Sequence, residues 1–263
     1  MTELNVRARS FGQVAELYDK RRPGYPSQLF DDLIASPAGS RAQRALEAGA
    51  GTGRATLELA RRGVHVTAIE HDAEMAAVAR RAARVAALPV EVLVQTFEAW
   101  DGEPSSFDLV VCAQAWHWID HGRGVAVAHT ALRPGGVLAL VWNLVTERHG
   151  PVHAAVDAVY AEHAPELLKT STLTGRVTQR IDPSTLAVDG FEPPQVLEYL
   201  WEWRIDAAAY AELIATHSDH ILLGPEKLDA LTTAVRAAIE QSGAGEIVIP
   251  YRTDLVMARR DAG

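Results

Sequence analysis

The chain has 263 residues, with 25 Lys and Arg against 34 Asp and Glu and a formal net charge of -9. This acidic balance argues against a protein whose main partner is the phosphate backbone of nucleic acid, and it favours a small-molecule partner. The length suits one large α/β domain that buries a sizeable core.

The single cysteine and the first residues bear on the compartment. Cys112 lies in the apolar run LVVCAQAW, so we expect neither a disulfide framework nor a cysteine metal cluster, as in a reducing cytosol. The opening MTELNVRARSF carries charges where a secretory peptide needs an apolar stretch, and no window approaches the roughly 20 apolar residues of a membrane-spanning helix. The sequence therefore predicts a cytoplasmic protein with no membrane partner.

From about Arg44 onward, short β-rich runs alternate with helical patterns, which is typical of a parallel sheet covered by helices. The expected strands are RALEAG (44–49), VHVTAIE (64–70), VEVLVQ (90–95), FDLVVCAQ (107–114) and VLALVW (137–142). The expected helices are TLELARR (56–62), DAEMAAVARRAARVAAL (72–88) and VAVAHTAL (125–132). Asp72 is a plausible N-cap, and RPGG is expected to form a turn before the fifth strand.

The last third of the chain has a different order of elements. A helix is expected from His153 to about Lys169, followed by a polar segment to about Pro183. Then come a strand (195–205), two helices (207–218 and 225–241) and a closing strand (246–260). Because no Pro- or Ser-rich linker intervenes, the sequence predicts a single domain. Its predicted parts are an N-terminal lead-in or lid (1–40), a cofactor-binding core (41–149), a cap insertion (150–183) and a C-terminal part of the same sheet (184–263).

The strongest motif is EAGAGTG, residues 47–53, between a predicted strand and a predicted helix. Gly49, Gly51 and Gly53 allow positive φ and a close approach of the backbone to a ligand. The loop also presents free backbone N–H groups at a helix N-terminus. A tight turn that binds nothing is the alternative, but three alternating glycines behind an acid exceed what a turn requires.

Spacing bears on which ligand the loop accepts. The dinucleotide fingerprint requires a glycine where this chain has Arg54. Glu70 ends the second predicted strand about 20 residues after the loop, where a carboxylate can accept both hydroxyl protons of a ribose. Both NAD and S-adenosylmethionine contain a ribose, so Glu70 indicates a nucleoside without choosing between them.

Together these segments resemble the class I S-adenosylmethionine-dependent methyltransferases. The resemblance is carried by EAGAGTG, Glu70, FDLVVCAQAWHWID, LRPGG with VLALVWN, and the opening FGQVAELYDKRRPGYP. It is strongest to the methyltransferase type 11 branch, which includes proteins similar to trans-aconitate methyltransferase. The resemblance implies a Rossmann-like, mostly parallel seven-stranded α/β sheet with helices on both faces, an antiparallel last strand and no metal requirement.

The resemblance also implies a set of cofactor-binding residues. The methionine moiety is assigned to Glu47, Gly49, Ala50 and Gly51, and the ribose to Glu70 and His71. The adenine is assigned to Thr96, Phe97 and Glu98, and the region of the reactive methyl to Gln114. Tyr18 and Arg22 belong to the segment that would cover the cofactor. The family often has an acid where this chain has Gln95. Phe97 therefore has two open interpretations, contact with the adenine ring and ordinary core packing.

Methyl transfer from a sulfonium needs an in-line nucleophile and a dry pocket more than covalent help from the enzyme. His117 lies between Trp116 and Trp118 in the loop after the fourth strand, so it is the candidate general base. The alternative is a histidine that only shapes the pocket, since a carboxylate acceptor needs no base. The tryptophans are interpreted as pocket walls.

The acceptor itself is expected to be a small molecule, methylated at a carboxylate or hydroxyl oxygen. The segment 150–183, with Arg148, Arg176 and Arg180 in or beside it, is predicted to close over this acceptor, and each arginine is either an acid-binding group or a solvated surface charge. Three other functions are open. The first is a cofactor-binding module without catalysis. An NAD-linked oxidoreductase is disfavoured by Arg54 and by the lack of a Tyr-x-x-x-Lys constellation, and a nucleic-acid methyltransferase is disfavoured by the net charge and by the sequence Gln-Ala-Trp-His after the fourth strand.

Overall fold

A computed structural model describes residues 15–35, 42–169 and 182–261, and its sheet has seven strands. The strands are β1 Arg44–Ala48, β2 His65–Glu70, β3 Val90–Val94, β4 Phe107–Ala113, β5 Leu132–Val145, β6 Gln195–Asp206 and β7 Glu246–Arg259. Their order in the sheet is β3-β2-β1-β4-β5-β7-β6. β1 pairs in parallel with β2 and β4, β2 with β3, and β4 with β5.

The helices of the described residues fall between these strands. They are α2 Ala15–Arg21, α3 Ser27–Ala35, α4 Arg54–Arg61, α5 Ala73–Val85, α6 His121–Ala131, α7 Pro151–His163, α8 Ala207–Ile214, α9 Ser218–Ile221 and α10 Pro225–Gln241, with short 3-10 turns η2 Phe97–Ala99, η3 Trp116–Trp118, η4 Pro165–Lys169 and η6 Pro183–Leu186. None of the helices in this described part is long and apolar enough to cross a membrane.

The last strand, β7, runs against its neighbours. Near one end of β7, the Arg260 N–H donates to Gly136, and further along the Thr146 N–H donates to Pro250, so β5 and β7 approach each other in opposite directions. Phe191, just before β6, makes an antiparallel bridge to Arg260. The predicted Rossmann-like sheet with an antiparallel last strand is confirmed, and β6 is antiparallel to β7 as well.

By its internal contacts the chain divides into two compact units. The sheet unit comprises the described residues of Gly24–Asn143, Ile181–Tyr199 and Thr253–Gly263, and the helical unit comprises those of Met1–Pro23, Leu144–Arg180 and Leu200–Arg252. The dividing points fall within β5, β6 and β7, so these three strands contribute residues to both units.

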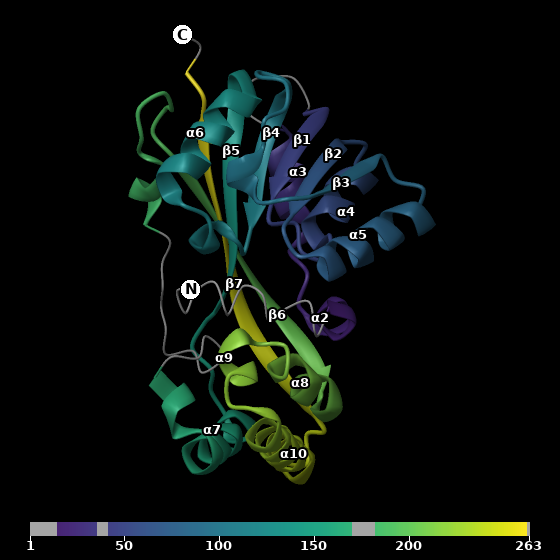
Figure 1. Cartoon of the computed structure of the whole chain (residues 1–263). Helices are drawn as coiled ribbons and strands as arrows, with labels where there is room; N and C mark the ends of the chain where they lie inside the picture. The colour runs from purple at the N-terminus through teal and green to yellow at the C-terminus, as the bar shows by residue number, and fades with distance from the viewer. Residues whose placement is uncertain (1–14, 36–41, 170–181, 262–263) are drawn as a thin grey trace. The chain divides into compact units, whose positions relative to one another are not determined.

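In the sheet unit, alternate residues of each central strand enter two different cores, one on each face. Leu109 and Val111 of β4 pack with α3, α4 and α5, whereas Val110 and Cys112 pack with η3 and α6. Figure 1 shows α4 and α5 beside β2 and β3, and α6 beside β5. Burial on both faces explains why β4 reads as a near-continuous apolar run, and Cys112 is buried as expected.

The helical unit has its own core. Apolar side chains of α7, α8 and α10 pack there with residues of β6 and β7, among them Val156, Leu213, Leu231 and Ile249. The helix expected from His153 is α7, which begins at Pro151. Part of the predicted cap, together with Arg176 and Arg180, lies outside the described residues.

Two local predictions differ from the structure. RPGG is not a turn before the strand but part of β5, because Leu132 already pairs with Phe107. Val137 then pairs with Leu109, so the four residues 133–136 of β5 lie opposite the single residue Asp108 of β4, and Gly135, at φ 77°, lies in the resulting bulge. Of the two interpretations of Arg148, the solvated surface charge is wrong, since its side chain is 4% exposed and donates to Asp157 at 2.7 Å.

Candidate functional site

The site predicted from the sequence is built where β1, β2, β3 and β4 end. These neighbouring strands are parallel, so their carboxyl ends lie at one edge of the sheet (Figure 1). In open α/β sheets, ligands bind at this edge, where the strand order reverses. The loop after β1 is tied to β2 by the Ala50 N–H, which donates to Ile69 at 3.0 Å.

The glycine loop has the backbone conformation that its sequence predicts. Gly49, Gly51 and Gly53 have φ of 66°, 58° and 90°. A Cβ on Gly49 would lie 2.5 Å from the Cβ of Ala115, so only glycine lets the β1 and β4 loops pack together. A Cβ on Gly51 would meet only the Met75 Cε, at 3.5 Å, so the backbone there is open to a ligand.

Glu70 holds this loop in place at the end of β2. It is 5% exposed, and its carboxylate accepts the Gly51 N–H at 2.8 Å and the Asp72 N–H at 2.9 Å. The His71 Nδ1 lies 2.9 Å from the same carboxylate. Burial alone would raise the pKa of Glu70, but the hydrogen bonds from His71, Asp72 and Gly51 lower it below its ordinary value.

The pKa of Glu47, at the head of the loop, is shifted in the opposite direction. Glu47 is 1% exposed and accepts a hydrogen bond from the Thr56 hydroxyl. Burial raises the pKa of Glu47 to about 8; the Thr56 hydrogen bond opposes this shift, and the nearby charge of Glu70 adds to it. Two acids therefore adjoin a loop of backbone N–H donors. The acids are suited to accept hydrogen bonds from a ligand that carries a cation and hydroxyl groups.

The loop after β3 contributes Thr96, Phe97 and Glu98. The Gln95 N–H donates to the Glu70 carbonyl at 3.2 Å, which fixes the loop beside β2. Phe97 is 3% exposed, and its ring packs in the core with Trp116 at 6.5 Å between centroids. Thr96 is exposed, and the half-buried Glu98 accepts the Asp120 N–H at 3.0 Å. Of the two interpretations of Phe97, the ring position supports core packing.

Gln114 directly follows β4 and has φ of 60°, a conformation that residues other than glycine rarely adopt. Its N–H donates to Val141 at 2.9 Å and its side-chain amide donates to the Asn143 carbonyl at 3.1 Å. Strain of this kind gathers at functional sites. Asn143 was not predicted, although it directly follows the fifth strand expected from the sequence. Its side chain also accepts a hydrogen bond from Thr253 at 2.6 Å and donates to the Gly24 carbonyl at 2.9 Å.

His117 is exposed, and its ring lies 4.5 Å from that of Trp118. Trp116 is buried and donates to His121 at 3.3 Å, so it belongs to the core and does not form a pocket wall. His117 lies in η3, in the loop after β4 where the sequence predicts it, three residues beyond Gln114.

Tyr18 and Arg22 belong to the helical unit. The Arg22 guanidinium lies 4.8 Å from the centre of the Tyr18 ring and donates to the Thr216 carbonyl at 2.9 Å. The remaining predicted site residues, from Glu47 to His117, all belong to the sheet unit.

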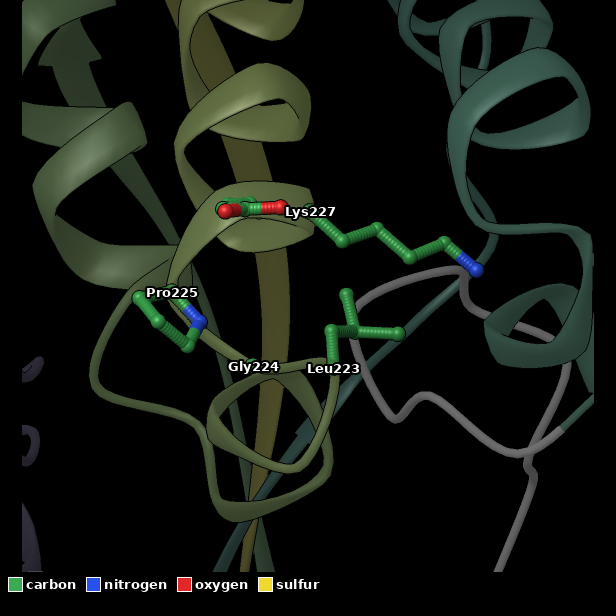
Figure 2. Close-up of a pocket in the computed structure, with 5 residues that line it drawn as sticks. Leu223, Gly224, Pro225 and Lys227 are labelled. Carbon is green, nitrogen blue, oxygen red and sulfur yellow. The ribbon is translucent and has the colours of Figure 1, made fainter.

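The helical unit also has an open hollow of about 480 Å³, lined by Leu223, Gly224, Pro225, Glu226 and Lys227 (Figure 2). It lies at the start of α10, and the Lys227 ammonium is paired with Glu166. None of the predicted site residues lines it, so it does not enter the argument for the site.

Known proteins resemble this chain in sequence and in fold. Residues 45–136 match the family model described as a methyltransferase domain. An uncharacterised methyltransferase of Mycobacterium tuberculosis is 44% identical over 157 residues, which cover 59% of this chain and 61% of that protein. A ubiquinone biosynthesis O-methyltransferase of Methylocella silvestris is 36% identical over 96 residues, covering 36% of this chain and 38% of that protein.

The chain thus spans about six tenths of the length of the first of these curated relatives. Among solved structures, a protein of Anaeromyxobacter dehalogenans assigned as a type II methyltransferase superimposes with a TM-score of 0.57 at 25% identity, covering 92% of this chain and 98% of that one. Sequence and fold together therefore identify residues 45–136 as a Rossmann-like methyltransferase domain.

Proposed function

We propose that the chain is an S-adenosylmethionine-dependent methyltransferase that acts on an oxygen atom of a small molecule. One observation carries the proposal. At the carboxyl ends of β1 and β2, the buried Glu70 carboxylate accepts a hydrogen bond of 2.8 Å from the Gly51 N–H, and a second buried acid, Glu47, belongs to the same loop. The methyltransferase-domain match over residues 45–136 supports it.

The residues present fit this cofactor. Gly51 has open space above its backbone, and Glu47 has a raised pKa that a neighbouring cation would lower. Glu47 with Gly49, Ala50 and Gly51 would hold the methionine moiety and its ammonium group, and Glu70 with His71 would hold the ribose hydroxyls. Because the Phe97 ring is in the core, the loop Thr96–Glu98 would present backbone and polar groups to the adenine edge.

When bound, the cofactor supplies an electrophilic methyl group on a sulfonium. The chain's own contribution is then to orient the two reactants and exclude water. Gln114, held in a left-handed conformation by Val141 and Asn143, would present its backbone near the reacting groups. His117 would accept the proton of a hydroxyl acceptor, whereas for a carboxylate acceptor it would only shape the site.

The preference for oxygen rests on the match to an O-methyltransferase of ubiquinone biosynthesis, and the preference for a small acceptor on the net charge of -9. The predicted cap and the covering role of Tyr18 remain part of the proposal.

Calorimetric titration tests the cofactor assignment. We expect S-adenosylhomocysteine to bind with one site per chain, and NAD to give no heat at the same concentration. NAD binding without adenosylhomocysteine binding would overturn the proposal in favour of an oxidoreductase. Transfer of a radiolabelled methyl group to members of a panel of small phenols and carboxylic acids would separate an enzyme from a binding module without catalysis.

A further inference from the structure

The interior of the helical unit holds a chain of polar side chains. The Asp219 carboxylate lies 2.7 Å from the His220 Nδ1, and the His220 Nε2 lies 2.7 Å from the Tyr160 hydroxyl. His220 and Tyr160 are 0% and 1% exposed. These contacts join α7 to α9, and every ring nitrogen of His220 is used.

His217, just before α9, is different. Its side chain is 8% exposed, and its ring lies 5.5 Å from that of His220. Its Nε2 is buried and has no hydrogen-bond partner among the described residues. Burial, followed by the charges of Arg22 and His220, lowers the pKa of His217 well below its ordinary value, so the imidazole is neutral at pH 7.

Arg22 contributes a second nitrogen of this kind to the same neighbourhood. Its Nη2 donates to the carbonyl of Thr216, the residue before His217, at 2.9 Å. Its Nε is buried and, like the Nε2 of His217, has no partner among the described residues. An arginine has five N–H donors and stays charged, so an unpaired, buried Nε–H favours an anionic oxygen.

Aromatic side chains lie near Arg22. Its guanidinium is 4.8 Å from the centre of the Tyr18 ring. The Arg22 charge also counteracts the effect of burial on the pKa of Tyr251, and Tyr251 is stacked on the partly exposed Trp201, with centroids 4.8 Å apart and planes at 18°. An aromatic acid therefore complements both the charged donor and the rings near it.

We propose that Arg22 and His217 form a binding site in the helical unit for the carboxylate of a small aromatic acid. The Arg22 Nε–H and the His217 Nε2–H donate to the two carboxylate oxygens, and the ring of the acid lies against the aromatic side chains. The assignment gives Arg22 to this acid, in place of the cofactor role that the family resemblance implies.

Benzoate is the probe, and the neutral isostere benzamide is its control. Fluorescence and ligand-observed NMR titrations use the whole chain without cofactor. We expect benzoate to bind at least tenfold more tightly than benzamide. His217→Gln should weaken benzoate binding at least tenfold. Arg22→Lys keeps a charge that can reach Thr216 but lacks the Nε–H, and it should weaken benzoate binding to a similar degree.

Matched controls in the same unit are His149→Gln and Arg204→Gln, whose side chains are 81% and 60% exposed. Both should bind benzoate as the unaltered chain does. Circular dichroism and adenosylhomocysteine titration of each variant show that it is folded, and the latter tests the proposed function separately. Equal affinities for benzoate and benzamide, no benzoate binding at millimolar concentration, or unchanged binding in both variants would overturn the site.

The same titrations distinguish the two sources of a carboxylate. Adenosylhomocysteine carries one as well. If Arg22→Lys and His217→Gln weaken adenosylhomocysteine binding tenfold and benzoate competes with it, the nitrogens serve the cofactor, and the assignment to an aromatic acid is wrong.

Discussion

Two glutamates that adjoin the same glycine loop differ in their ionisation because their hydrogen-bond partners differ. Glu70 accepts two backbone N–H groups and adjoins His71, which outweighs the effect of burial and lowers its pKa. Glu47 has a single hydroxyl donor, Thr56, and burial prevails. The sequence alone marks both positions as acidic but does not reveal this difference, because it depends on the N–H groups that the folded loop presents.

Glu47 should make the stability of the free protein depend on pH. The pKa of Glu47 is about 8 in the folded chain, against an ordinary value of 4.5, so the folded chain retains a proton that the unfolded chain releases. The free energy of unfolding therefore falls as pH rises from about 4.5 to 8, by up to roughly 1.4 kcal/mol per pH unit. Glu47→Gln removes this dependence, so the variant gains stability relative to the unaltered chain as pH rises.

Urea denaturation at pH 5, 6, 7 and 8 measures the difference. Glu74→Gln is the control, because Glu74 is an exposed acid in the first turn of α5. Parallel stability profiles for Glu47→Gln and the unaltered chain would show that Glu47 ionises normally.

Glu70→Ala should weaken adenosylhomocysteine binding by about 1 to 3 kcal/mol, since a carboxylate hydrogen bond to each ribose hydroxyl is lost and the Gly51 loop loses its anchor. Calorimetry measures the effect, and Glu74→Ala serves as the control. An unchanged dissociation constant in a folded variant would remove Glu70 from the cofactor site.

Gly51 and Gly63 form a matched pair for testing whether the glycine loop binds the cofactor. Both have positive φ, 58° and 87°, so a side chain strains either backbone similarly. A Cβ on Gly63 would meet nothing within 4 Å, and Gly63 lies in the turn before β2, away from the loop. We expect Gly51→Val to abolish adenosylhomocysteine binding and Gly63→Val to leave it within about twofold, with both variants destabilised by roughly 1 to 2 kcal/mol. Equal binding by the two variants would mean that Gly51 does not face the ligand.

At the scale of elements, the sequence predicts most of the sheet unit because its signals are local. β4 is apolar apart from Asp108 since both of its faces are buried, and Asp72 caps α5 as expected by accepting the N–H groups of Glu74 and Met75. The β5 bulge was missed because Pro-Gly-Gly also fits a turn. The α3 helix was missed because it follows the proline-rich lead-in, and its apolar face is evident only against α4.

Asp72→Ala should destabilise the protein by about 1 kcal/mol, since two N–H groups at the start of α5 lose their acceptor. Thermal unfolding followed by circular dichroism measures it. The backbone N–H that Asp72 donates to Glu70 survives the substitution, so adenosylhomocysteine affinity should change by less than about threefold. A loss of binding without a loss of stability would indicate that the Asp72 carboxylate itself contacts the ligand.

The predicted site residues of the sheet unit follow from strand ends, whereas the polar interior of the helical unit could not be read from the sequence. Tyr160 and His220 lie 60 positions apart and come from α7 and α9. Arg22 and Thr216 lie 194 positions apart. No periodicity or short motif joins such residues, and a lone histidine in a helical pattern is indistinguishable from a solvated one until the chain is folded.

At the scale of the whole molecule, the two units divide the proposed chemistry. The glycine loop, Glu70 and Gln114 belong to the sheet unit, while Arg22 and His217 belong to the helical unit, and β5, β6 and β7 supply residues to both. Each unit has a core of its own, so each can respond to its own ligand.

Amide hydrogen exchange should therefore resolve two separate footprints. Adenosylhomocysteine should slow exchange in residues 49–54, 70–73 and 95–98, because the backbone N–H groups of the glycine loop and its neighbours become bonded to ligand. Benzoate should slow exchange around Thr216 and His217 and in α7, whose Tyr160 is bonded to α9 through His220. Slower exchange around Tyr18 and Arg22 with adenosylhomocysteine alone would instead support the covering role over the cofactor. At one fixed ligand concentration, Glu70→Ala should reduce only the first footprint and His217→Gln only the second, so a variant that reduces both would show that the two units do not bind their ligands independently.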